Sequence, residues 1–157
     1  MFTGEEPTKE EANEFADFLK AELVSSQVLK AGENREEYFR PCRDFGNLFL
    51  DPDTGVRLDR KRSEKHIFGE ELVKIVRARP KALTLIFDQS YSRADERASA
   101  IEEKLEFFAG QNVYGFAYDS HATFLLLCHD LKLLEHAHIV LLENSHLPRK
   151  RIIHKQC

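Results

Sequence analysis

Apolar residues recur with a helical period near the start of the chain and then gather in short runs. After Thr8, apolar positions return every three or four residues, which predicts a helix over 9–29. Thr8 and Glu11 have the spacing of a capping box at its start. Two short apolar runs around a Pro- and Gly-containing turn predict a β-hairpin over 47–58. A second helical stripe predicts a helix over 63–78.

The second half of the chain alternates between strand-like and helix-like segments. Apolar runs predict strands at 82–88, 113–119 and 138–143 with a short last strand at 150–154, and periodic patterns between them predict helices at 93–109 and 121–135. Strands that alternate with helices at this spacing form right-handed βαβ units. The sequence therefore predicts an α/β fold with three layers and a mainly parallel sheet: a Rossmann-like βαβαβ core at 82–143, with the N-terminal helix and β-hairpin added.

The length and composition favour one folded domain. A chain of 157 residues with 42% hydrophobic residues can bury a core without disulfides or metals. We expect a single α/β domain over 1–157, in which 1–62 holds the N-terminal helix and hairpin and 63–157 the core and a basic C-terminal tail.

The net charge and the cysteines limit the partners and the compartment. The formal net charge is −4, so the whole chain has no basic field for nucleic acid or membranes, although basic residues collect at 57–65 and 149–155. Three cysteines without motif spacing favour a reducing compartment, cytoplasmic or nuclear. No apolar run reaches the ~18 residues of a membrane span, so we expect no membrane partner.

Three acids each end a predicted strand. Asp88, Asp119 and Glu143 are separated by about one βα unit. Carboxyl ends of parallel strands share one rim of a sheet, where α/β folds bind ligands. Carboxylates that lie close together repel one another and call for a cation, and Mg²⁺ or Mn²⁺ suits their oxygens. The sequence therefore predicts a metal site at Asp88, Asp119 and Glu143.

This rim resembles that of the PIN-like and NYN-type nucleases, in which strand-end carboxylates hold Mg²⁺. The resemblance covers the short motif "LIFDQS" at 85–90 and the acidic rim; the acids expected on a fourth βα unit are missing. The alternative is that the acids only cap the helices that follow, as Asp and Asn often do.

Further polar residues follow the same predicted strands. His121 and His146 come soon after Asp119 and Glu143, and an imidazole there can act as a general base. The residues expected to contact the substrate are Ser90, Arg93, Ser120, Arg149, Lys150 and Arg151.

The leading hypothesis is a metal-dependent phosphoesterase or nuclease that acts on nucleic acid (RNA or DNA) or on a nucleotide. The alternative is a non-catalytic module on the same fold that binds a protein or a nucleic acid. A third hypothesis is a metal-independent enzyme that acts on a nucleotide or sugar phosphate. The oligomeric state stays open.

Overall fold

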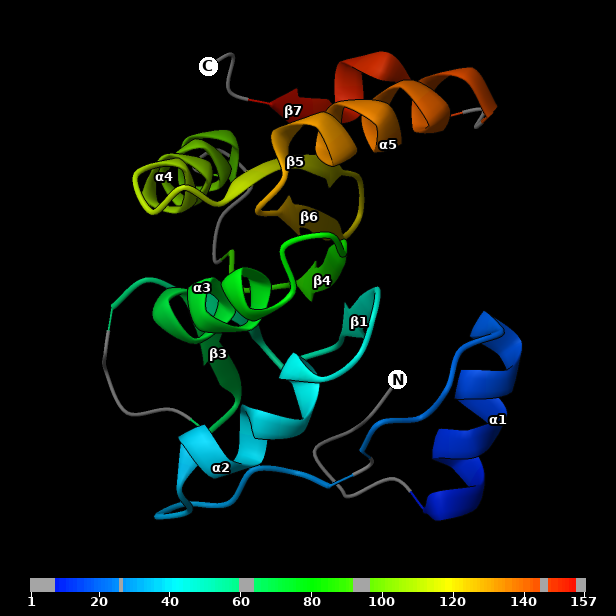
Figure 1. The fold of residues 1–157 in the computed structure, drawn as a ribbon, viewed down its shortest axis with the longest axis vertical. Coiled ribbons are helices and arrows are strands. Elements are labelled where there is room, and N and C mark those ends of the chain that lie inside the picture. Colours follow the sequence, from blue (N-terminus) through cyan, green and yellow to red (C-terminus); the bar gives the residue numbers. More distant parts are fainter. Residues whose placement is uncertain (1–7, 26, 60–63, 92–96, 145–146, 155–157) are drawn as a thin grey trace.

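Five strands form the main sheet, in the order β1-β4-β6-β5-β7, and Figure 1 shows them stacked in that order. The computed structural model describes residues 8–25, 27–59, 64–91, 97–144 and 147–154. In chain order the strands of this sheet are β1 (Leu48–Leu50), β4 (Thr84–Asp88), β5 (Tyr114–Asp119), β6 (Thr123–Cys128) and β7 (Ile152–His154).

The main sheet is mostly antiparallel. Only β1 and β4 run parallel, while β6 is antiparallel to both β4 and β5, and β7 is antiparallel to β5. A separate parallel pair consists of β2 (Gly55–Arg57) and β3 (His66–Phe68). The fold is therefore mixed α/β, as predicted, but the prediction of a mainly parallel, Rossmann-like sheet is wrong.

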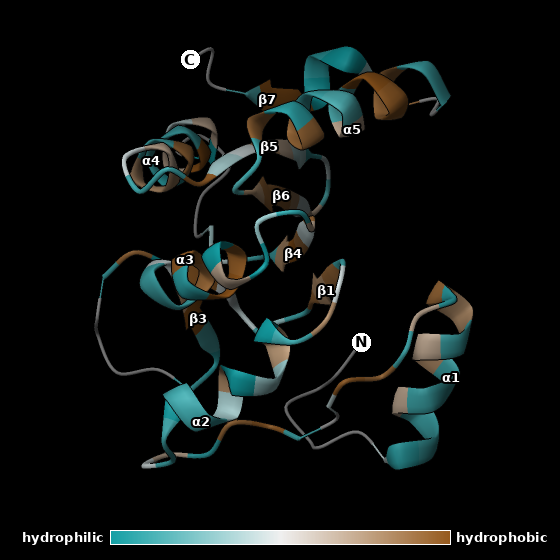
Figure 2. Cartoon of the chain, in the orientation of Figure 1, coloured by the Kyte–Doolittle hydropathy of each residue, from teal (hydrophilic) through white to brown (hydrophobic). Residues whose placement is uncertain are grey.

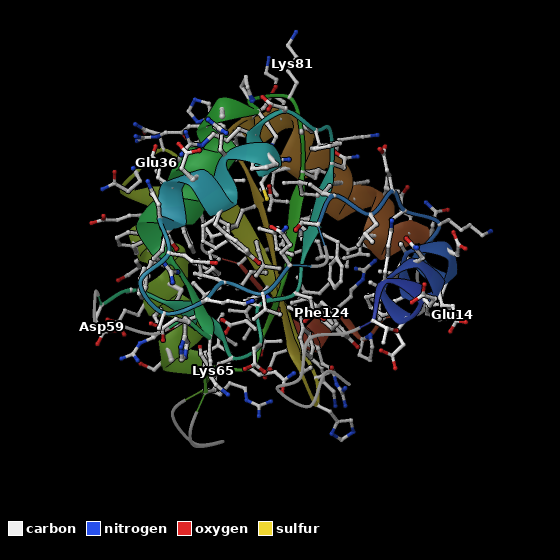
Figure 3. The ribbon with its side chains drawn as sticks, turned by 90° about the horizontal axis from the view of Figure 1, so that it is seen from below. Glu14, Glu36, Asp59, Lys65, Lys81 and Phe124 are labelled. Carbon is white, nitrogen blue, oxygen red and sulfur yellow. The ribbon has the colours of Figure 1, made fainter. Side chains whose placement is uncertain are left out.

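Helices lie on both sides of the main sheet. Viewed along the long axis, α3 and α4 lie on one side and α5 and α1 on the other (Figure 3). The helices are α1 (Lys9–Leu19), α2 (Arg35–Phe39), α3 (Gly69–Ala78), α4 (Arg97–Ala109) and α5 (Leu131–Asn144), with 3₁₀ turns η1 (Arg40–Arg43) and η3 (Arg149–Arg151). None of the helices in the described ranges is long and apolar enough to cross a membrane.

The largest error of the sequence interpretation concerns residues 121–144. The predicted helix over 121–135 contains β6, and the predicted strand over 138–143 belongs to α5. A tight turn joins β5 to β6, in which the Ser120 N–H donates to the Ala122 carbonyl over 3.0 Å. A turn this short reverses the chain, so β5 and β6 pair in antiparallel fashion and no crossover helix fits between them.

The N-terminal predictions are correct only in part. Thr8 and Glu11 form the predicted capping box, but α1 ends at Leu19, where Lys20 adopts a left-handed conformation with φ of 52°. The predicted hairpin over 47–58 is wrong. Its two strands, β1 and β2, pair with β4 and β3 and not with each other.

Other elements match their predictions in whole or in part. The strands at 82–88 and 113–119 correspond to β4 and β5, and the last strand at 150–154 to β7. The helix at 93–109 corresponds to α4 from Arg97 onward. The predicted helix at 63–78 is correct only from Gly69, where α3 begins, because residues 66–68 form the strand β3.

Two apolar clusters fill the space between the sheet and its helices. Strands β4 and β6 are predominantly hydrophobic (Figure 2). The larger cluster lies between the sheet, α3 and α4, and its fully buried members include Leu72, Ile75, Val76, Ile86, Ile101, Phe108, Leu125 and Leu127. The smaller cluster, on the face covered by α5, is built on Phe116, Cys128 and Leu134.

The antiparallel position of β6 makes a prediction for amide hydrogen exchange. Since β6 is hydrogen-bonded to a strand on each side, the amides of Thr123–Cys128 should exchange at least about 100-fold more slowly than those of α1. Exchange at residues 123–128 as fast as in α1 would contradict this sheet order. Mass spectrometry of peptides from the exchanged, intact protein measures both.

Candidate functional site

Asp88, the last residue of β4, is a carboxylate without any solvent exposure. Side chains alternate along a strand, so Thr84, Ile86 and Asp88 face the same buried side of the sheet. An ionised carboxylate in such a place requires hydrogen-bond donors and a nearby positive charge.

Both oxygens of Asp88 receive several hydrogen bonds. Oδ1 accepts from the Val56 N–H (3.0 Å) and the Ser90 N–H (3.1 Å), and lies 2.8 Å from the Ser90 hydroxyl. Oδ2 accepts from the Tyr91 hydroxyl (2.9 Å) and from Lys104 Nζ (2.6 Å). These donors belong to β2, to the residues after β4, and to α4. The carboxylate therefore ties three separate parts of the chain together.

Lys104 is the counter-charge, and its side chain is only 7% exposed. Its ammonium donates to Asp88 Oδ2 and to Ser90 Oγ, each over 2.6 Å, and lies 4.1 Å from the centre of the Tyr91 ring. Burial lowers the pKa of Lys104, while the charge of Asp88 and its hydrogen bond act in the opposite direction.

Ser90 is the hydroxyl at the centre of this network. It accepts a hydrogen bond from Lys104, and it can donate its proton to Asp88 or to the Val56 carbonyl, 2.9 Å away. Ser90 is half-buried and lines a pocket together with Tyr91 and Lys104.

Gly55 allows β2 to approach Asp88 this closely. Its φ is +111°, and a Cβ atom added there would lie 2.1 Å from Asp88 Oδ1. Any other residue would have both a strained backbone and a steric clash.

A pocket of about 500 Å³ opens beside Ser90 and Lys104. Its other walls come from β2 and the residues after it, from β3 and from α4: Val56, Arg57, Leu58, Asp59, His66, Tyr91, Ala100 and Glu103. Burial, and next the charge of Arg57, lower the pKa of His66, so its imidazole is neutral at pH 7. The pocket therefore offers a hydroxyl, an amine and an imidazole.

Asp119 lies at the end of β5, close to its predicted position, but not beside Asp88. Both acids pair with Thr123 from opposite sides of β6, which places them two strand spacings, roughly 10 Å, apart. Asp119 accepts from Thr123 Oγ1 (3.0 Å) and Arg97 Nη1 (3.3 Å). The two acids also affect Tyr91. Burial raises the pKa of its hydroxyl, the charge of Asp88 raises it further, and the charge of Asp119 adds a smaller increase.

The third predicted ligand, Glu143, is exposed on α5 and does not end a strand. The prediction of three strand-end acids on one parallel rim is therefore wrong, because β6 separates β4 from β5 and residues 138–143 are helical. Within the described ranges, no group of three or more His, Cys, Asp or Glu residues could hold a metal ion. Metal binding by these residues stays a prediction.

The remaining predicted residues occupy separate places. Ser120 and His121 lie in the β5–β6 turn, and His121 is exposed. Arg149, Lys150 and Arg151 form the exposed turn η3. His146 and Arg93 lie outside the described residues. Among the predicted residues that the structure describes, Asp88 and Ser90 are the two that lie together at the pocket, in hydrogen-bond contact.

The sequence interpretation missed Lys104, although a signal was present. Lys104 lies on the same helical stripe as the buried Ile101, Leu105 and Phe108. A lysine at a core position of an amphipathic helix indicates a buried anion. Gly55 and Val56 gave no such signal, because they are close to Asp88 only in the folded chain and not in the sequence.

Comparison of the chain with protein-family models, with curated proteins and with solved structures gives no match.

Gly55→Ala tests the close approach of β2 to Asp88. The substitution should lower the free energy of unfolding by at least about 2 kcal/mol, because it adds backbone strain and a clash with the carboxylate. Gly46→Ala is the matched control: its Cβ would meet no atom within 4 Å, so the change should stay within about 0.5 kcal/mol. Urea denaturation followed by circular dichroism measures both; equal effects would refute the packing described.

Asp88→Asn separates the buried ion pair from a metal site. Leaving Lys104 charged and unpaired should lower the free energy of unfolding by about 3 to 5 kcal/mol. A repulsive cluster of carboxylates predicts the opposite sign, together with a rise in melting temperature when Mg²⁺ or Mn²⁺ is added to the unsubstituted protein. Thermal and urea denaturation, with and without each ion, distinguish the two; a stabilised Asp88→Asn variant would contradict the ion pair.

Proposed function

We propose that the chain is a serine-type hydrolase or acyltransferase whose site is the pocket beside Ser90. Ser90 is the nucleophile, Lys104 is the general base, and Asp88 is the residue that positions Lys104. The proposal is carried by the 2.6 Å contact of Lys104 Nζ with Ser90 Oγ, next to its 2.6 Å contact with Asp88. A nucleophile, its base and a third group that orients the base are the general arrangement of such enzymes.

Lys104 can act as a base only in its neutral form. Burial lowers its pKa and so increases the neutral fraction near the operating pH. The position of Nζ is fixed by Asp88 on one side and by the Tyr91 ring on the other. When Lys104 loses its proton, its amine can still donate a hydrogen bond to Asp88 Oδ2, which keeps Nζ beside Ser90 Oγ, where it can accept the Ser90 proton directly.

In the reaction, Ser90 Oγ forms a bond to the carbonyl carbon of an ester or amide while its proton passes to Lys104 Nζ. The bond between that carbon and the leaving group breaks, and the leaving group takes the proton from Lys104. The acyl group then stays on Ser90 until water, or another alcohol or amine, gives a proton to Lys104 and bonds to the carbonyl carbon; the bond from that carbon to Ser90 Oγ breaks, and Ser90 takes the proton back from Lys104.

The charges of the pocket favour a carbonyl substrate over a phosphate. Arg57 is paired with Asp59 over 2.7 Å and Lys104 with Asp88, while Glu103 adds a further negative charge. His66 adds no positive charge at pH 7, because burial lowers its pKa. The lining residues that the structure describes carry no excess positive charge and so do not attract a phosphate dianion, whereas an uncharged acyl group enters without an electrostatic penalty.

The metal-dependent phosphoesterase or nuclease remains a separate hypothesis. It needs Mg²⁺ or Mn²⁺ at a strand end, and Asp119, with a side chain 27% exposed, is the acid of β5 that such an ion would meet. The two hypotheses use different residues, since the serine-type reaction depends on Ser90 and Lys104 and has no place for Asp119.

Labelling with a fluorophosphonate probe tests the serine-type reaction. The probe should modify Ser90, at a rate that rises with pH as Lys104 loses its proton. Ser90→Ala should abolish labelling, and Lys104→Met should reduce it at least about 100-fold. Ser120→Ala is the matched control, because Ser120 is also half-buried at a strand end but has no hydrogen bond to a lysine in the described ranges; it should label normally. Mass spectrometry of the labelled peptide identifies the site; folded protein that stays unlabelled at Ser90 between about pH 7 and 10 would refute the proposal.

A further inference from the structure

A row of aromatic side chains crosses the face of the main sheet opposite the Ser90 pocket. Phe87 on β4 pairs with Phe124 on β6, which pairs with Tyr118 on β5. Residues paired directly across neighbouring strands point to the same face, so the three rings form a row. The ring centres of Phe87 and Phe124 are 5.2 Å apart, and Figure 3 places Phe124 on the side of the sheet towards α1.

The apolar cores do not include this aromatic row. Helix α5 covers the same face of the sheet through the smaller cluster, around Phe116 and Cys128. Neither buried cluster, nor the half-buried residues packed against it in the described part of the chain, includes Phe87, Phe124 or Tyr118. All three are half-buried. The row is therefore an aromatic surface beyond the cover of α5.

Positive charges lie at one end of the aromatic row. Tyr118 pairs with Ile152 of β7, and Ile152 directly follows the exposed turn of Arg149, Lys150 and Arg151. These three cations form no ion pair with any carboxylate in the described ranges.

The strand positions on this face carry no acid among the residues that the structure describes. Asp88 and Asp119 pair with Thr123, one position from the aromatic row, and so point to the opposite face. The acidic helix α1 approaches the face near the other edge, where the Phe15 ring lies 6.5 Å from that of Phe49 on β1. Figure 1 shows β1 and β7 at opposite edges of the sheet, so the path along the aromatic row towards β7 leads away from α1.

We propose that this face binds single-stranded nucleic acid, with bases stacked on Phe87, Phe124 and Tyr118 and phosphates along Arg149–Arg151. Aromatic rings stack on any base, and cations beside them hold the backbone. The row spans two strand spacings, about 10 Å, which accommodates two or three bases, as on other sheets that bind RNA. The combination of aromatic rings with unpaired cations favours this ligand over a protein partner. A duplex hides the faces of its bases and cannot stack in this way.

Oligo(U) and oligo(dT) of about 20 nucleotides are the probes. The chain of 157 residues has four tyrosines and no tryptophan, so stacking on Tyr118 should quench its tyrosine fluorescence. Tyr118→Phe should bind as tightly as the unsubstituted protein but lose most of the quenching. Phe124→Leu, which keeps the apolar packing, should weaken binding about tenfold. Phe18→Leu on α1 is the control, since Phe18 is 81% exposed but lies outside the row; it should bind normally.

The cations are tested by salt dependence. Replacing Arg149, Lys150 and Arg151 with Ser should weaken binding and lower the slope of log K against log salt by about two, at ~0.7 per contact. The charge-matched control replaces the exposed Lys9, Lys81 and Lys132 with Ser and should leave that slope unchanged. Three results would overturn the proposal: no oligonucleotide binding at about 50 mM salt; equal affinity for a duplex; or self-association, measured by sedimentation, that Phe124→Leu abolishes, which would mean that a second copy covers this face.

Discussion

The buried carboxylate of Asp88 is the constraint on which the arrangement of the other elements depends. A charge without solvent must be compensated by hydrogen bonds and a counter-charge, and here the donors come from Val56, Ser90, Tyr91 and Lys104. Each donor fixes its own segment against the end of β4. Apolar packing alone is non-directional. The network therefore fixes the position of the small β2–β3 sheet and the rotation of α4 about its axis.

The sequence predicted those elements whose pattern is local. Asp88 ends an alternating strand and Ile101, Leu105 and Phe108 share a helical stripe, so β4 and α4 were recognised. Strand β6 was not, because it is the central strand and has apolar residues on both faces; its run of leucines shows no period of two. Asp130, whose Oδ1 accepts from the N–H groups of Lys132 and Leu133, begins α5 directly after it. Strand β6 and the first residues of α5 were therefore interpreted as one helix, over 121–135.

The sequence predicted part of the candidate site, because only part of it follows from a local pattern. Asp88 and Ser90 were found because a polar sequence follows an apolar strand. The prediction that Asp119 and Glu143 lie beside Asp88 assumed a direction and an order of the strands. A local sequence pattern does not determine either of them. Lys104 was identifiable from its place on the buried side of α4. What the sequence could not supply was the hairpin of β5 and β6, which inserts Thr123 between Asp88 and Asp119.

Two consecutive residues at the end of β4 point to opposite faces of the sheet. Phe87 points to the aromatic row and Asp88 to the pocket, because side chains of a strand alternate. Their contacts do not overlap: Phe87 meets Phe124, whereas Asp88 meets Lys104, Ser90, Tyr91 and Val56. A change at Phe124 therefore alters one surface and leaves every hydrogen bond of Ser90 in place. The reverse does not hold. Loss of the Asp88 network releases the end of β4 itself, and with it the backbone that carries Phe87. The aromatic row therefore depends on the buried ion pair, whereas the pocket does not depend on the aromatic row.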